Sequence, residues 1–172
     1  MKKLLLPIFV LFIFILESLF VELFSPQLFN SDRIIVPHFL LVVLLFLTVY
    51  GGKKQGILYA AIFGLLFDIV YTEVIGIYFF LYPMIAYFVS KTMQLIHNHL
   101  VVVSLTSMVG IILLELGVYE LNYLLKVTEM DFQTFLQERL YPTLILNLAF
   151  TILVSFPLKR QFDKYAEELR NE

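Results

Sequence analysis

Three acidic side chains lie inside long apolar stretches of this chain, where a carboxylate is least expected. Glu17, Asp68 and Glu115 each have mostly apolar neighbours on both sides. A carboxylate inside a membrane span is energetically costly, so such residues face a protein interior or a polar cavity and mark a functional site by default. The chemistry open to them is cation or ligand binding, proton exchange, or hydrogen bonding between helices.

The most informative of these stretches surrounds Asp68. Gly56, Ala60, Gly64 and Asp68 recur every four residues, which places them along one face of a helix. Small residues at this spacing allow two helices to approach closely inside a membrane. The sequence therefore predicts a helix-packing groove formed by Gly56, Ala60 and Gly64 that leads to a carboxylate.

The composition indicates a membrane protein. Of the 172 residues, 60% are hydrophobic, against roughly 45–50% in a soluble domain. The excess lies in long runs, which predict a single all-α domain covering residues 1–172, with six transmembrane helices. The expected spans are residues 4–24, 37–50, 56–71, 76–90, 100–125 and 140–157, followed by an amphipathic tail, 158–172, on the membrane surface.

The distribution of basic residues predicts the orientation. Six spans place both termini on one side, together with nine Lys and Arg residues, whereas the other side carries only Arg33, Lys126 and Arg139. The positive-inside rule makes the nine-residue side cytoplasmic. We therefore expect a multi-pass protein of the cell membrane with both termini in the cytoplasm.

This topology places the three acids at similar depth. Counting about 1.5 Å per residue from the cytoplasmic end of each span, Glu17, Asp68 and Glu115 lie roughly 18–22 Å along, in the outer half of the bilayer. Asn147 reaches the same zone from the opposite direction. These four residues form a predicted intramembrane polar cluster, and both polar contacts between helices and a binding role would explain it.

No Lys or Arg lies within any predicted span. The candidate cationic partners of the acids are Arg33, His38 and Arg139, all near the outer ends. We expect Arg139 or His38 to contact one or more of the acids.

Other chemistries have little support in the sequence. There is no Cys, which excludes disulfides and thiolate metal sites. The chain contains no zinc-protease, serine-hydrolase or phosphate-loop motif, so neither catalysis nor a cofactor or metal is expected. The basic tail is more typical of a membrane anchor than of a nucleic-acid site.

Several segments together resemble the MreD family of bacterial rod-shape proteins. The resemblance lies in Glu17-Ser18, Val36 to Leu40, Tyr59 to Asp68, Gly76, Ala86-Tyr87, Glu115 and Pro142 to Asn147. Family members commonly carry Gly-x-x-x-Gly-x-x-x-Asp, and this chain has Ala60 at the first Gly.

The resemblance implies a non-enzymatic scaffold of the bacterial elongation complex in the cytoplasmic membrane. The implied partners are an MreC-like bitopic protein, the actin-like MreB, the glycosyltransferase RodA and a class B penicillin-binding protein. It also implies a fold similar to the six-helix substrate-binding subunits of energy-coupling-factor transporters. The alternative is therefore a small-molecule-binding membrane subunit of a vitamin or solute transporter.

Overall fold

The structure, a computed structural model, describes residues 5–23, 33–96 and 99–170. Every secondary-structure element among these residues is helical. The elements are α1 (Leu5–Leu23), α3 (Phe39–Phe46), the π-helical turn η1 (Leu47–Gly51), α4 (Lys53–Tyr71), α5 (Ile77–Leu95), α6 (Leu100–Leu124), the short α7 (Phe132–Thr134), the π-helical η2 (Phe135–Leu140) and α8 (Tyr141–Arg170). The predicted all-α class is confirmed.

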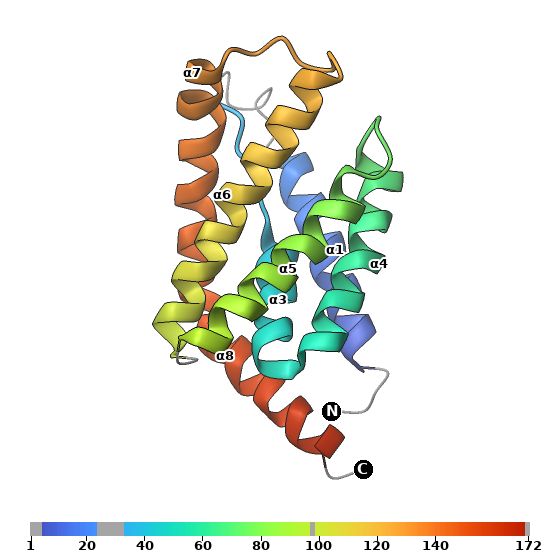
Figure 1. Cartoon of the computed structure of the whole chain (residues 1–172), viewed down its shortest axis with the longest axis vertical. Coiled ribbons are helices and arrows are strands. Elements are labelled where there is room, and N and C mark those ends of the chain that lie inside the picture. The colour runs from blue at the N-terminus through green and yellow to red at the C-terminus, as the bar shows by residue number, and fades with distance from the viewer. Residues whose placement is uncertain (1–4, 24–32, 97–98, 171–172) are drawn as a thin grey trace.

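The long helices run alternately up and down the long axis of the molecule (Figure 1). The beginning of α1 and the end of α8 lie at the same end, and α7 lies at the other. The short α3 lies between the surrounding helices in this view, preceded by an extended segment. Consecutive helices are therefore antiparallel, as expected for a chain that crosses a membrane repeatedly.

Among the described residues, four stretches are long and apolar enough to cross a membrane: α1, α4, α6 and the continuous run from α7 to α8. They form a six-helix arrangement with α5, which has 19 residues, and with the shorter α3–η1 unit. The predicted span 37–50 corresponds to this unit. Its 13 helical residues, 39–51, rise by at most about 20 Å, less than the roughly 30 Å of a hydrocarbon core.

The α3 helix is enclosed by protein. All eight of its residues, Phe39–Phe46, are buried, and all eight are apolar. A helix that is hydrophobic on every side belongs in a core, because no face needs water. The sequence alone cannot distinguish such a segment from a lipid-facing span, since both are uniformly apolar.

The predicted groove on α4 packs against two different elements. A Cβ atom added at Gly64 would lie 2.5 Å from the backbone oxygen of Tyr78 on α5, and one added at Gly56 would lie 2.6 Å from Cβ of Thr48 on η1. Ala60, between them, is fully buried. Only glycine allows the backbones to approach this closely.

Several helix bounds differ from those predicted. α4 begins at Lys53 instead of residue 56, after Gly52, whose positive φ of 132° ends η1. α5 continues to Leu95, beyond the predicted residue 90. Its internal Pro83 does not end the helix.

The tail was predicted as a separate helix on the membrane surface, whereas α8 continues without a break through Pro157 to Arg170. From residue 158 onward, the apolar side chains of α8 are buried or half-buried against other parts of the protein. Phe162 is buried, with its ring centroid 6.3 Å from that of Phe9 on α1, and Tyr165 is buried near Gly51. The contacts of these two side chains are therefore with α1 and η1.

Candidate functional site

The candidate site consists of buried polar side chains contributed by four helices. Glu17 comes from α1, Asp68 from α4, Glu115 from α6 and Asn147 from α8, and all four are buried. Each polar group here needs a partner, because an unpaired polar atom is costly away from water. The partners define what the site does.

Asp68 binds the amino-terminal end of the next helix. Its carboxylate accepts hydrogen bonds from the backbone N–H groups of Gly76 (2.9 Å), Tyr78 (2.9 Å) and Phe79 (2.8 Å). The first N–H groups of a helix have no partner within it and carry a partial positive charge. Asp68 therefore satisfies the start of α5 from a neighbouring helix.

The small residues of the groove bring α4 close enough to α5 for Asp68 to contact the first N–H groups of α5. Gly64 lies one turn before Asp68 on α4 and touches the backbone of Tyr78, which draws the two helices together. Gly76, immediately before α5, has a φ of 116°, a left-handed conformation that favours glycine. The small residues and the carboxylate thus act together at one helix junction.

Glu17 likewise accepts a hydrogen bond from the first turn of a neighbouring helix, here α3. Its Oε2 accepts a hydrogen bond of 2.7 Å from the backbone N–H of Leu40, in the first turn of α3. The other carboxylate oxygen, Oε1, is buried and has no hydrogen-bond partner among the described residues. Glu17 is thus half engaged, and its free oxygen can accept one more donor.

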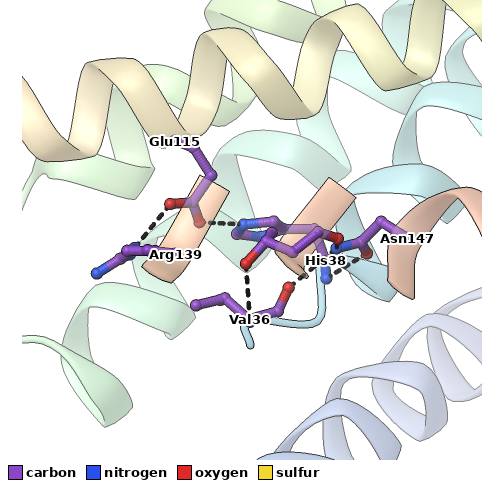
Figure 2. A network of polar contacts seen from close by, with 6 residues as sticks. Val36, His38, Glu115, Arg139 and Asn147 are labelled. Carbon is purple, nitrogen blue, oxygen red and sulfur yellow. Dashed lines mark hydrogen bonds and ion pairs between the residues drawn. The ribbon is translucent and has the colours of Figure 1, made fainter. Parts of the chain in front are cut away.

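Glu115 is the centre of an ion-pair cluster. Its Oε1 lies 2.6 Å from Nε2 of His38, and its Oε2 accepts a 2.7 Å hydrogen bond from Nε of Arg139 (Figure 2). Glu115 and His38 are fully buried, whereas Arg139 remains 26% exposed. The contact joins α6 to the residue preceding α3 and to η2, which leads into α8.

Asn147 fixes the extended segment that leads into α3. Its Oδ1 accepts from the backbone N–H of His38 (2.8 Å), and its Nδ2 donates to the backbone oxygens of Val36 (2.9 Å) and Thr143 (2.8 Å) (Figure 2). The Thr143 hydroxyl accepts from the N–H of Val36 at 3.0 Å. We call Val36, His38, Glu115, Arg139, Thr143 and Asn147 the His38 network.

The structure brings some of the predicted residues together and separates others. His38, Arg139, Glu115 and Asn147 meet in one network, as the cationic-partner hypothesis anticipated for one of the acids. Asp68 differs from that hypothesis, because its partners are backbone amides of α5. The third candidate cation, Arg33, is exposed at the start of the segment leading to α3.

Sequence reasoning missed Thr143 and the backbone of Val36. A signal was present, since Thr143 lies four residues before Asn147 and therefore on the same helix face. No pattern indicated that an extended backbone would run along that face.

Among the described residues, no three His, Cys, Asp or Glu side chains lie close enough to hold a metal ion. The polar atoms are used instead to fix helix ends and one extended segment inside the bundle.

Comparison with known proteins agrees with the pattern of these residues. The family model described as rod shape-determining protein MreD matches residues 2–164. The chain belongs to the MreD family. It shares 33% identity over all 172 residues, and over the whole of the relative, with the rod shape-determining protein MreD of Bacillus subtilis (strain 168).

A second relative supports the assignment. The cell shape-determining protein MreD of Streptococcus pneumoniae (strain ATCC BAA-255 / R6) is 29% identical over 128 residues, covering 74% of this chain and 76% of that protein. No solved structure matches the chain. Family membership and the four long apolar helices identify an integral membrane protein of cell-shape determination.

Proposed function

We propose that this MreD-family protein is a non-enzymatic scaffold that holds an MreC-like bitopic protein and the peptidoglycan synthases of the elongation complex in the membrane. MreB, RodA and a class B penicillin-binding protein complete the proposed set of partners. The function is to keep wall synthesis along the side of a rod-shaped cell.

The observation that carries the proposal is the use made of the intramembrane acids. Asp68 and Glu17 bind backbone N–H groups at helix starts, and Glu115 is held between His38 and Arg139. Groups committed to such contacts stabilise a fixed shape and are poorly placed to transfer protons to a substrate. A rigid bundle whose outer helix faces are apolar suits a protein that binds other membrane helices.

The proposed orientation has both termini in the cytoplasm. The first residues of α1 and the last of α8 lie at one end of the molecule (Figure 1). The basic side chains of Lys53, Lys159 and Lys164 belong to helix segments at that end, which agrees with the positive-inside rule.

Co-purification tests the proposal directly. The full-length protein, tagged and expressed at native level, should retain the MreC-like protein of its own cell after detergent extraction, and its depletion should convert rods to spheres. Normal rod shape after full depletion, or no retention of that partner, would reject the scaffold.

The second candidate is a solute-binding subunit of a transporter. The half-engaged Glu17 favours it, because that carboxylate faces a pocket in the outer half of the bundle. Loss of uptake of one solute on depletion, with cell shape and partner retention unchanged, is the result this alternative predicts.

A further inference from the structure

A pocket of about 580 Å³ opens between α1, α4, the start of α5 and the extended segment before α3. Its size lies within the range of about 300–1,000 Å³ found for small-molecule sites. Glu17 and Tyr78 are buried at its floor, whereas Val21, Glu22 and Tyr71 are exposed at its rim. A ligand can therefore enter from the surface and reach a buried carboxylate.

The floor of the pocket presents an acceptor that the fold leaves unused. Glu17 is only 3% exposed, and its Oε2 is occupied by the N–H of Leu40. Its Oε1 has no partner among the described residues. The Arg139 guanidinium and the His38 ring both contact Glu115 instead of Glu17.

One wall of the pocket is aromatic. The ring centroid of Phe67 lies 4.9 Å from that of Tyr71 and 4.4 Å from that of Tyr78. Aromatic faces attract cations through the ring quadrupole, and the attraction grows as the cation loses water. The Tyr71 hydroxyl, hydrogen-bonded to Ser18, is held in place at the edge of this wall.

These features select the chemical class of the ligand. Among the described residues, the side chains that line the pocket include the acidic groups of Glu17 and Glu22 but no Lys or Arg, so the charge that fits is positive. A bare divalent ion requires several oxygen ligands, and no such group of acids or histidines exists among the described residues. An ammonium group on an apolar body matches both the carboxylate and the aromatic wall.

We propose that this pocket binds an organic ammonium group, with Glu17 Oε1 as its acceptor and Phe67, Tyr71 and Tyr78 as the surrounding aromatic surface. The ammonium is carried by a phospholipid headgroup or by a free amine, since the two share this chemistry. Such binding requires no transport and does not depend on the scaffold function proposed above.

The test uses the full-length protein in nanodiscs of phosphatidylglycerol alone, titrated with phenylethylammonium and, in parallel, with uncharged 2-phenylethanol. We expect a saturable rise in melting temperature with the cation only. Glu17→Gln keeps an oxygen for the N–H of Leu40 but cannot ionise beside a cation, and should weaken binding about 10- to 100-fold. Glu120→Gln, an exposed carboxyl on α6, is the matched control and should bind as the unmodified protein does.

A second variant tests the pocket without changing a buried residue, in case Glu17→Gln does not fold. Val21 is 49% exposed at the rim, so Val21→Trp should narrow the entrance without disturbing the buried contacts, and should also abolish binding. Adding phosphatidylethanolamine to the nanodiscs distinguishes an ammonium group carried by a lipid headgroup from one carried by a free amine. A lipid ligand stabilises the unmodified protein but not Glu17→Gln and competes with the free amine, whereas a soluble ligand meets no competition.

Three results would overturn the proposal. The first is no saturable response to the amine or to phosphatidylethanolamine in folded protein. The second is an equal response to 2-phenylethanol, and the third is unchanged affinity in both Glu17→Gln and Val21→Trp.

Discussion

Glu115 and His38 are 77 residues apart in the sequence, and the Oε1 and Nε2 atoms of their buried side chains lie 2.6 Å apart. Arg139 contacts the other oxygen of the same carboxylate at 2.7 Å. Through this one side chain, α6 is joined both to the segment leading into α3 and to η2, which leads into α8. The junction is therefore the place where a single substitution should affect several helices at once.

Removing the charge of Glu115 should destabilise the protein strongly. Glu115→Gln leaves Arg139 and His38 without a carboxylate, and breaking a buried ion pair costs about 3–5 kcal/mol. We expect the lower end of this range because Arg139 is partly exposed. Unfolding of the detergent-purified protein, followed by helical circular dichroism, measures the loss.

A double-mutant cycle tests whether Arg139 is the relevant partner. Glu115→Gln with Arg139→Gln should be more stable than the sum of the two single losses predicts. Strict additivity would show that the pair does not interact. Glu120→Gln, exposed on the same helix, should shift stability by no more than about 0.5 kcal/mol.

Asp68→Asn should destabilise the start of α5. The amide group has one acceptor oxygen in place of two, and its N–H₂ faces backbone donors, so at least one N–H loses its partner. The expected loss is about 1–3 kcal/mol. Arg139→Gln should not rescue this variant, since Arg139 contacts Glu115; rescue would contradict the structure. Glu73→Gln, exposed just beyond α4, serves as the control.

Gly64→Leu should separate α4 from α5. The new side chain would collide with the backbone of Tyr78, which cannot move aside as a side chain can. We expect low abundance in the membrane and loss of the MreC-like partner, measured by blotting and pull-down. Ile69→Ala, at a site 61% exposed on the same helix, should leave both unchanged. Normal abundance of Gly64→Leu would mean that the helices are not this close.

The orientation can be tested by labelling, because the chain contains no Cys. A membrane-impermeant maleimide added to intact cells should label Glu129→Cys but not Lys164→Cys. Both positions are exposed in the structure, so burial does not explain a difference. Labelling of residue 164 from outside would reject cytoplasmic termini.

Asp131 caps the start of α7 outside the membrane spans, and the strength of this cap depends on pH. Hydrogen bonds from the side chain and backbone N–H of Thr134 lower the pKa of its carboxyl. A carboxyl whose pKa is lower in the folded state stabilises that state above its unfolded pKa, and the contribution is lost as the pH falls through the folded value. Loosening of α7 is therefore expected only under acid conditions.

The amide resonances of Gln133 and Thr134 report this event. In a titration by nuclear magnetic resonance, they should shift with a midpoint below the ordinary Asp value of about 3.9. The shift should be absent in Asp131→Asn. A midpoint at or above the ordinary value would contradict the cap.

Periodicity and composition predicted the helical class, the groove face of α4 and the inward position of the acids. They could not predict the hydrogen-bond partners of these acids. A backbone N–H that binds a carboxylate belongs to almost any residue type, so the sequence does not identify it. Asp68 illustrates this, since the sequence contains no side chain that identifies the start of α5 as its target. The enclosure of α3 was also hidden, because lipid and protein interior favour the same apolar residues.

The enclosure of α3 has a consequence for biogenesis. Its first turn is held by Glu17, which is synthesised earlier, but the residue before it is held by Glu115 and Asn147, which leave the ribosome some 77 and 109 residues later. This helix is too short to cross a bilayer alone. Its buried position in the bundle is therefore complete only after the last helix is inserted. The second hydrophobic segment to be translated is thus among the last to reach its final position, and truncation before α8 should leave it unprotected from quality-control proteases.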